Sequence, residues 1–352
     1  SGTTGLPKGV ELTHRNLFTM MPVATKIWEF DDESINLQAM PLFHIAGSGW
    51  GLAGLYCGAH NVMLRDIDPR EVLRLIENYR VTHALLVPAV LQFLLQVPEI
   101  ETTDFSTLRT MTYGASPITE EVLVGSMKAM GCRFIQVYGL TETTGAVTWL
   151  PPEDHDPGGP KADLLRSAGK AWGDVELKIV DPETLEEKPD GEVGEILIRT
   201  IQNMKCYWKR EDGTREALIE DGWFRSGDAG YLRDGYLFIH DRVKDMIVSG
   251  GENIYPAEIE NVLMSHPGVR DCAVIGVPSE KWGETVKAMI VKADHSEPDE
   301  RELVDYCRER LAHYKCPTSI DWIEMIPRNP SGKILKTELR KPFWEGRERF
   351  VG

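Results

Sequence analysis

The 352-residue sequence lacks features that mark several other classes of protein. It has no uncharged apolar run of about 18 residues, so we expect no integral membrane segment. It is also poor in basic residues, with 39 Lys and Arg against 55 Asp and Glu and a formal net charge of −16. Nucleic-acid-binding proteins normally carry a basic surface, so this balance argues against nucleic acid as a partner.

The six cysteines include no C-x-x-C pair and no arrangement that resembles a zinc-ligand set. We therefore expect reduced thiols and a cytoplasmic location. The sequence begins Ser-Gly-Thr-Thr-Gly, without an initiator methionine and without a signal-peptide pattern. We interpret it as the middle and end of a longer protein, and the sequence leaves a homo-oligomer open.

The composition is that of a folded globular protein, with 42% hydrophobic and 27% charged residues. Its length predicts two or three domains. In the front part, Asp68 followed by Pro69 predicts the start of a helix. Residues 81–87 form a short apolar run that ends at Pro88, and a second helical stretch follows. Alternation of strands and helices implies a mostly parallel α/β sheet.

After about residue 170 the pattern changes to alternating strands with hairpin turns, such as Asp234-Gly235. We predict a β subdomain over about 170–243, within a large domain that covers 1–243. Residues 244–352 predict a small mobile α+β domain. Its expected elements are a helix near Pro256, strands at 272–277 and 286–292, a helix at 300–312 and a strand at 320–326.

The first nine residues are typical of a loop that wraps around phosphate groups. Small residues let the backbone approach phosphate oxygens, while hydroxyl groups and one ammonium group add donors and charge. The candidate binding residues are Ser1, Gly2, Thr3, Thr4, Gly5 and Lys8. A Walker A loop requires Gly-Lys-Ser/Thr, and here Pro7 precedes the lysine and Gly9 follows it. Taken alone, the segment fits a flexible linker equally well.

The loop resembles the phosphate-loop signature of the adenylate-forming superfamily, which includes acyl-CoA synthetases. Further segments resemble that family's other motifs in the family's order: 41–44 (PLFH), 113–117 (YGASP), 138–142 (YGLTE), 223–228 (WFRSGD), 241–245 (DRVKD), 249–253 (SGGEN) and 327–333 (PRNPSGK). The resemblance covers residues 1 to about 341 and is greatest to acyl-CoA synthetases of the fatty-acid or aryl-acid type. It implies a large nucleotide- and acyl-binding domain followed by a small mobile domain.

The resemblance implies an enzyme that activates a carboxylic acid with ATP and Mg²⁺ and passes the acyl group to CoA. Lys333 would reach the α-phosphate and the substrate carboxylate; the alternative is a surface lysine in a basic tail. Glu142 would hold Mg²⁺ and Thr141 would donate to a phosphate, although Thr-Glu is also common at helix starts.

The remaining nucleotide contacts follow from the same motifs. The adenine slot would consist of Gly114, Ala115, Ser116 and Tyr138, although Tyr138 could also be a buried core tyrosine, and Gly139 would be a further nucleotide contact. The ribose hydroxyls would bind Asp228, with Arg242 beside them, although an aspartate after a glycine is also common in turns.

Lys244 corresponds to the hinge about which the small domain rotates between two poses. In the second pose, Gly250 and Gly251 would line the passage of the CoA thiol, where a side chain would obstruct it. The alternative is a plain Gly-Gly turn. His44 would lie at the acyl pocket as a gate, although a lone histidine in an apolar segment is often a core residue.

The family has a further segment before the phosphate loop, so we assign the expected activity to the full-length enzyme and expect this chain to expose apolar surface. Two alternatives remain: an adenylation enzyme that loads a carrier protein, and a nucleotide-binding fragment without turnover. The absence of a following carrier domain favours CoA. Apolar and small residues over 44–54 and 138–148 favour a medium- or long-chain fatty acid or an aryl acid.

Overall fold

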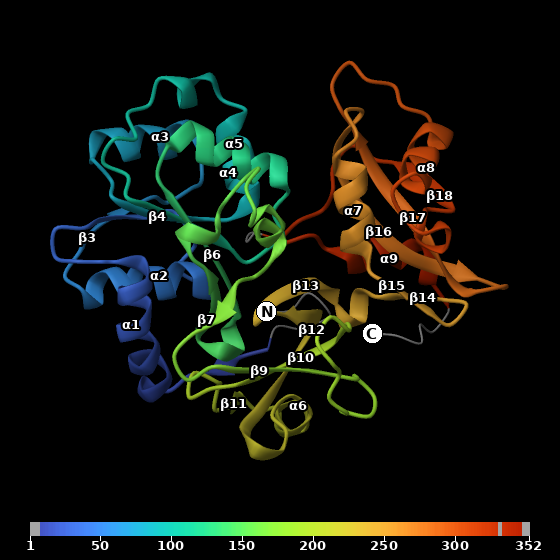
Figure 1. Cartoon of the computed structure of the whole chain (residues 1–352), viewed down its shortest axis with the longest axis horizontal. Helices are drawn as coiled ribbons and strands as arrows, with labels where there is room; N and C mark the ends of the chain where they lie inside the picture. The colour runs from blue at the N-terminus through green and yellow to red at the C-terminus, as the bar shows by residue number, and fades with distance from the viewer. Residues whose placement is uncertain (1–7, 330–332, 347–352) are drawn as a thin grey trace. The chain divides into compact units, whose positions relative to one another are not determined.

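The computed structural model describes residues 8–329 and 333–346, and these fall into two compact units. Of the described residues, the first unit holds 8–226 and 231–238, and the second holds 227–230 and 239–346 apart from the gap. The sequence predicted a domain limit at 243/244; in the structure, residues 227–230 and 239–243 group with the second unit. Figure 1 labels the helices and strands.

An eleven-stranded sheet runs in the order β3-β2-β4-β5-β6-β7-β8-β13-β12-β10-β9. Its first five strands are parallel, and helices cover both faces of this part, with α3, α4 and α5 on one side and α1 and α2 on the other (Figure 1). The strands here are β2 (Ile35–Gln38), β3 (His60–Met63), β4 (His83–Leu86), β5 (Thr110–Gly114) and β6 (Arg133–Leu140). The helices are α1 (His14–Trp28), α2 (Ile45–Tyr56), α3 (Pro69–Asn78), α4 (Pro88–Leu95) and α5 (Glu120–Met130).

Helix α3 begins where the sequence predicted. The side chain of Asp68 accepts a hydrogen bond of 3.0 Å from the backbone N–H of Glu71, and Pro69 occupies the first turn. These contacts satisfy a free donor and preset the backbone of the first turn. The helix then buries an apolar stripe, and strand β4 is buried along its whole length. The predicted parallel α/β layer is confirmed.

The other strands of this sheet are antiparallel to their neighbours where their register is defined. They are β7 (Gly145–Leu150), β8 (Lys170–Ala171), β9 (Glu176–Val180), β10 (Gly194–Arg199), β12 (Trp223–Arg233) and β13 (Tyr236–Arg242). Asp234, at φ 53°, and Gly235, at φ 78°, form the turn between β12 and β13, as the sequence predicted. A separate ribbon pairs β1 (Val10–Glu11) with β11 (Cys206–Tyr207), and α6 (Glu211–Ala217) follows it.

The second unit is built on a five-stranded sheet in the order β15-β14-β17-β16, with β18 parallel to β17. Alternate residues of β16 face two cores: Cys272 and Val274 pack with α7 and α8, while Ala273 and Ile275 pack with α9. The elements are β14 (Ile247–Ser249), β15 (Glu252–Ile254), α7 (Pro256–Met264), β16 (Val269–Ser279), β17 (Gly283–Lys292), α8 (Glu300–Arg308), β18 (Ser319–Trp322) and α9 (Lys336–Trp344).

Two of the predicted boundaries in this unit were wrong. Helix α8 ends at Arg308, short of the predicted residue 312, and β18 ends at Trp322, short of 326. The basic tail that was the alternative for Lys333 forms helix α9, in which Leu339 is buried and Lys336 and Arg340 are only 8% and 7% exposed. Charged residues are almost never buried without partners, so their number in the tail gave no sign of a packed helix.

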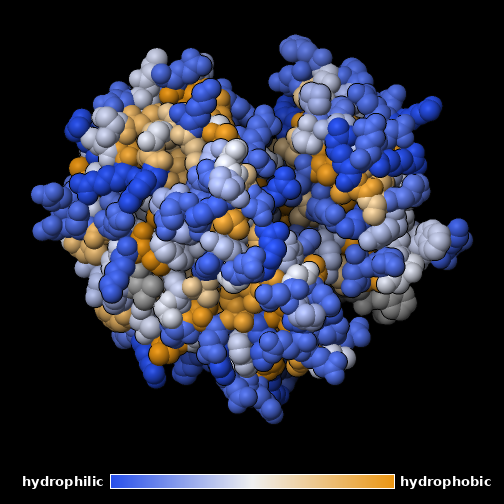
Figure 2. All heavy atoms as spheres, in the orientation of Figure 1, coloured by the Kyte–Doolittle hydropathy of each residue, from blue (hydrophilic) through white to orange (hydrophobic). Residues whose placement is uncertain are grey.

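The surface is mostly hydrophilic, with apolar residues at several points of the face seen in Figure 2. Exposed large apolar side chains are frequent on α1, α2, β3 and the adjoining loops: Phe18, Leu42, Phe43, Leu52, Leu55, Tyr56, Met63 and Ile67. Among the described residues, no helix combines the length and the apolar character that crossing a membrane requires.

Candidate active site

The predicted phosphate loop ends in a defined contact. Its first residues, Ser1, Gly2, Thr3, Thr4 and Gly5, lie outside the described residues. Its lysine is described, and Nζ of Lys8 lies over the ring of Tyr207, 4.8 Å from the ring centroid. A cation over an aromatic face is attracted by the ring quadrupole. Lys8 is therefore held beside a residue from a distant part of the sequence.

The β1–β11 ribbon produces this contact. Val10 pairs with Tyr207 and Glu11 with Cys206, and the backbone N–H of Trp208 donates to the carbonyl of Gly9 at 2.7 Å. Since both strands are only two residues long, the antiparallel register fixes which side chains meet. The ribbon thus fastens the end of the predicted phosphate loop to the segment that carries Tyr207.

Glu142 forms a hydrogen bond with the same tyrosine. The Tyr207 hydroxyl donates a hydrogen bond of 2.9 Å to Oε1 of Glu142, and Glu142 is only 7% exposed. The backbone holds the glutamate as well, because the N–H of Met204 donates to its carbonyl at 2.6 Å. Glu142 follows Thr141 in a short 3-10 turn, over Thr141–Thr143, directly after β6. The structure therefore joins Lys8 and Glu142 through one aromatic residue.

The turn after β6 can only be built with glycine at position 139. A Cβ atom there would lie 1.9 Å from the carbonyl oxygen of Gly145, which is backbone and cannot move aside. Tyr138, beside it on β6, is half-buried. The hydroxyl of Thr143 accepts from the N–H of Leu140 at 3.0 Å and closes the turn. This local construction sets the direction in which Glu142 points.

The predicted adenine slot lies at the end of β5. A Cβ on Gly114 would meet the carbonyl oxygen of Val137 at 2.1 Å, so the two strands approach too closely for a side chain. Ala115 follows with φ of 67°, a left-handed conformation that costs a non-glycine residue about 1 kcal/mol or more. Ser116 is half-buried. A strained residue between two predicted binding residues is consistent with a site, since such strain often occurs at ligand clamps.

His44 has a clear structural role. It is the N-terminal cap of α2, and its Nδ1 accepts a hydrogen bond of 3.1 Å from the backbone N–H of Ala46. That bond satisfies one of the unpaired donors at the helix start. The ring is half-buried, so it is also accessible in part. Its function as a gate to the acyl pocket stays a prediction.

In the second unit, the two predicted ribose ligands contact each other. Nε of Arg242 lies 2.8 Å from Oδ1 of Asp228, whose side chain is 8% exposed. The arginine side chain is 30% exposed, so the pair is accessible from the arginine side. The pairing orients the carboxylate of Asp228 in a fixed direction.

The predicted hinge residue, Lys244, lies in a short 3-10 turn, over Val243–Asp245. Burial lowers the pKa of Lys244 to about 8, although the nearby Asp245 acts in the opposite direction. A buried lysine with a lowered pKa is partly neutral at mildly alkaline pH. The turn at Val243–Asp245 therefore places an ammonium group in desolvated surroundings.

Gly250 and Gly251 form the turn between β14 and β15. Their φ angles are 61° and 87°, which side chains rarely adopt. The N–H of Gly250 donates to the carbonyl of Trp282 at 2.8 Å, and a Cβ on Gly250 would meet the Trp282 ring at 2.8 Å. Gly251 faces open space. The two glycines thus differ in steric surroundings, which a test can use.

Lys333 is held by its backbone. Its N–H donates to Oδ1 of Asn329 at 2.9 Å, its carbonyl accepts from the N–H of Asn329, and a β-bridge joins Arg328 to Ile334. The side chain is half-buried. Helix α9 begins three residues later with Lys336, so the lysine stands directly before a packed helix rather than in a basic tail.

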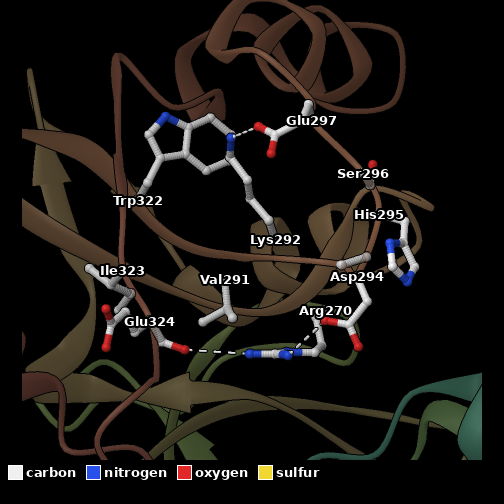
Figure 3. Close-up of a pocket in the computed structure, with 11 residues that line it drawn as sticks. Arg270, Val291, Lys292, Asp294, His295, Ser296, Glu297, Trp322, Ile323 and Glu324 are labelled. Atoms are coloured by element: carbon white, nitrogen blue, oxygen red, sulfur yellow. Dashed lines mark hydrogen bonds and ion pairs between the residues drawn. The ribbon is translucent and has the colours of Figure 1, made fainter.

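A hollow of about 520 Å³ lies elsewhere on the second unit, between β17, β18 and the loop that follows β17 (Figure 3). Its cations already have carboxylate partners: Arg270 contacts Asp294 at 3.2 Å, and Lys292 pairs with Glu297. Lys292 also lies over the ring of Trp322, 4.8 Å from its centroid. None of the predicted site residues lines this hollow, so we do not assign it to the nucleotide.

The described residues contain no group of three or more His, Cys, Asp or Glu side chains that would suit a metal ion. A magnesium ion that accompanies ATP needs no such cage, because Mg²⁺ keeps several waters and takes one or two carboxylates together with phosphate oxygens. The carboxylate of Glu142 has the donor chemistry that this ion prefers. The residues present therefore fit Mg²⁺ at Glu142.

Sequence reasoning did not find Tyr207, nor the partners that bury Lys336. Tyr207 lies in none of the motifs that the sequence shows, and its contact with Glu142 depends on the register of the β1–β11 ribbon. Lys336 contacts Asp241 at 3.4 Å and Glu260 at 2.9 Å; Asp241 is the first residue of the motif at 241–245, and Glu260 lies in no motif. The spacing of Lys336 and Arg340, four residues apart, was a usable signal, since such residues share a helix face.

The sequence matches two family models. The model for the AMP-binding enzyme family matches residues 1–208, and the model for the AMP-binding enzyme C-terminal domain matches residues 258–333. These spans include Lys8, Glu142 and Lys333 among the predicted site residues.

Two relatives and one solved structure illustrate the likeness. The chain is 44% identical over 358 residues to the fatty acid–[acyl-carrier-protein] ligase ScoC of Streptomyces coeruleorubidus, which covers 100% of the chain and 68% of the relative. It is 41% identical over 349 residues to the long-chain-fatty-acid–CoA ligase FadD13 of Mycobacterium tuberculosis, covering 97% and 66%. ATP-bound MatB from Rhodopseudomonas palustris superposes with a TM-score of 0.90 at 31% identity, covering 97% of the chain and 67% of that protein. The chain thus spans about two thirds of the length of these relatives.

Proposed function

The chain belongs to the AMP-binding enzyme family of ATP-dependent acid–thiol ligases, and from this premise we propose that the protein converts a carboxylic acid, ATP and CoA into an acyl-CoA, AMP and pyrophosphate. The mixed α/β fold, with its large sheet, is that of adenylate-forming enzymes. The proposal extends from the family to the substrates and to the residues that act on them.

The chemistry has two steps. A carboxylate resists attack by a thiol because it is negatively charged and has no good leaving group. In the first step, a carboxylate oxygen attacks the α-phosphorus of ATP, and the bond from that phosphorus to the pyrophosphate breaks. In the second, the thiol attacks the acyl carbon, and AMP leaves with the bridging oxygen. The first step needs charge stabilisation and positioning more than covalent help.

The observation that carries the proposal is that Lys8 and Glu142 both contact Tyr207, Lys8 at the ring face and Glu142 at the hydroxyl. A cation at the end of a phosphate loop and a buried carboxylate beside it form the usual pair for a nucleotide with its metal ion. Mg²⁺ held at Glu142 would neutralise negative charge on the leaving pyrophosphate. Thr141, next to Glu142, would donate its hydroxyl to a phosphate oxygen.

We also assign residues to the nucleoside and to the α-phosphate. We assign the adenine to Gly114, Ala115, Ser116 and Tyr138, with Gly139 as a further nucleotide contact. Asp228, oriented by Arg242, would accept hydrogen bonds from the ribose hydroxyls. Lys333 would reach the α-phosphate and the attacking carboxylate, where an ammonium group stabilises the developing charge.

For the second step we propose rotation about Lys244, which brings the Gly250–Gly251 turn to the nucleotide in place of Lys333. CoA is the proposed thiol, because the name of FadD13 specifies a CoA ligase. The second candidate is a carrier protein, which the name of ScoC, at 44% identity, favours. Both acceptors present a thiol, so the chemistry does not separate them.

We propose a long- or medium-chain fatty acid as the first choice of acyl substrate, with an aryl acid as the second. Helix α2 supports this, because its residues are apolar or small and Trp50 is among the most deeply buried side chains. No Lys or Arg occurs in α2 that would pair with a second acid group. We also propose a cytoplasmic location, since all six cysteines are described and none forms a disulfide.

A substrate panel tests this function. ATP–pyrophosphate exchange is measured with octanoate, palmitate, ferulate and succinate as the added acid, and AMP release is then measured after addition of CoA or of a phosphopantetheinylated carrier protein. We expect exchange with the monocarboxylates and AMP release with CoA. Nucleotide binding without exchange for any acid would contradict catalysis, and AMP release with the carrier protein alone would establish the second candidate.

A further inference from the structure

Tyr207 holds the two groups on which phosphate binding is proposed to depend. Its residue is 6% exposed, its hydroxyl donates to Oε1 of Glu142 at 2.9 Å, and its ring faces Nζ of Lys8 at 4.8 Å. These contacts use different parts of one side chain. The hydroxyl serves the carboxylate, and the π face serves the cation.

The backbone of Tyr207 is fixed on both sides. Its N–H donates to the hydroxyl of Thr214 at 2.9 Å, and its carbonyl accepts from the N–H of Arg210 at 3.1 Å. Its pairing with Val10 in the β1–β11 ribbon fixes the position of Tyr207 along the end of the phosphate loop. The backbone that carries the ring is thus held in place, and the contacts of the side chain restrain the side chains of Lys8 and Glu142.

We propose that Tyr207 is a positioning residue for the magnesium and phosphate end of the nucleotide site; this rests on the proposed function. Its hydroxyl holds one carboxylate oxygen of Glu142, so the other oxygen would be the one to bind Mg²⁺. Its ring holds the Lys8 ammonium on the same residue that binds the carboxylate, so one side chain restrains both the positive and the negative partner of the phosphates. Mutation of a group that orients a metal ligand commonly lowers the metal affinity by about 10- to 100-fold.

The two contacts can be removed one at a time. Tyr207→Phe deletes the hydroxyl and retains the ring, so it releases Glu142 and leaves Lys8 in place. Tyr207→Leu deletes both. The matched control is Tyr236→Phe, because the hydroxyl of Tyr236 also donates to a buried carboxylate, Oδ2 of Asp154, at 2.8 Å in the same unit. If loss of the hydroxyl only disturbs the local structure, Tyr207→Phe and Tyr236→Phe should change ATP binding by the same amount.

The experiment measures binding by titration calorimetry rather than turnover. Each variant is titrated with ATP at a series of Mg²⁺ concentrations, and separately with AMP without Mg²⁺. We expect Tyr207→Phe to raise the Mg²⁺ concentration for half-maximal ATP binding roughly tenfold and to leave AMP affinity unchanged. Tyr207→Leu should weaken ATP binding further, and Tyr236→Phe should match the wild type.

Either of two results with Tyr207→Phe overturns the proposal. One is a Tyr207→Phe variant with the Mg²⁺ dependence of the wild type, and the other is an equal loss of AMP and MgATP affinity. If Tyr207→Leu does not fold, as judged by circular dichroism, the phenylalanine pair still decides. If the wild type binds MgATP but shows no acid-dependent exchange, the proposed function fails, while the Mg²⁺ titrations still decide the role of Tyr207. Wild-type ATP binding that is independent of Mg²⁺ also overturns the proposal.

Discussion

The ammonium nitrogen of Lys336 lies 3.4 Å from Oδ2 of Asp241, so the helix after the proposed catalytic lysine is tied to the proposed hinge motif. Lys336 also contacts Oε1 of Glu260 at 2.9 Å, and one turn further on Arg340 contacts Asp245 at 2.7 Å. Burial lowers the pKa of Lys336, but the two carboxylates more than offset this, so the pKa is raised and the lysine stays charged.

Removal of that charge should destabilise the second unit. Lys336→Met leaves Asp241 and Glu260 buried without their cation, which typically costs about 3–5 kcal/mol. Lys341→Met, on the exposed side of the same helix, should change the free energy of unfolding by less than about 0.5 kcal/mol. Urea unfolding of both variants, compared with the wild type, measures the difference. Equal stabilities would show that the buried network contributes nothing.

Lys333 should be needed for one half-reaction only. Lys333→Ala removes the cation proposed to stabilise charge at the α-phosphate, so adenylation should fall by about 10²- to 10³-fold. Thioester formation from supplied acyl-AMP should continue, because AMP is already in place as the leaving group. Lys341→Ala controls for loss of a nearby positive charge. Equal loss of both half-reactions would refute the assignment.

The two glycines of the β14–β15 turn should affect the other half-reaction. Gly250→Ala places a Cβ 2.8 Å from the Trp282 ring at φ of 61°, whereas Gly251→Ala meets open space at φ of 87°. Both should slow thioester formation and spare ATP–pyrophosphate exchange, with the larger effect at Gly250. Exchange and thioester rates are measured on each variant. A parallel loss of both rates in Gly250→Ala would rule out a role confined to the thiol.

Acid should destabilise the first unit through two buried histidines. Burial lowers the pKa of His83 and of His155 to about 4, compared with about 6.5 in an unfolded chain. Between these values the unfolded chain binds protons that the folded chain does not, so the free energy of unfolding falls as the pH falls through that window. Above about pH 7.5, where both states are deprotonated, the two groups contribute almost no pH dependence.

The expected loss between pH 7 and pH 5 is about 2 kcal/mol for each histidine. His155→Gln should reduce the pH dependence by about that amount, while His60→Gln, at an exposed position, should not. Urea unfolding at the two pH values measures this. A wild type and a His155→Gln variant with the same pH dependence would contradict it.

Local patterns predicted the elements whose causes are local. The Asp68 cap, the apolar run before Pro88 and the Asp234-Gly235 turn each act within a few residues, and the structure confirms all three elements. Gly139 is required by the backbone at Gly145, and it lay in a motif that the sequence showed.

The contacts that were not predicted are tertiary. Tyr207 meets Glu142 because two-residue strands pair in one register, and such short strands carry no periodic signal. The burial of Lys336 depends on carboxylates that sequence order separates from it by much of the second unit. A charge pattern alone does not show which side of a helix is packed.

The central claim is that a carboxylate oxygen attacks the α-phosphorus of ATP. The most direct test supplies the acid with both carboxylate oxygens labelled with ¹⁸O, together with ATP and CoA, and determines the mass of the nucleotide product. Because AMP leaves with the bridging oxygen, the account predicts AMP that carries one ¹⁸O atom. Unlabelled AMP, or ADP with labelled phosphate, would contradict it.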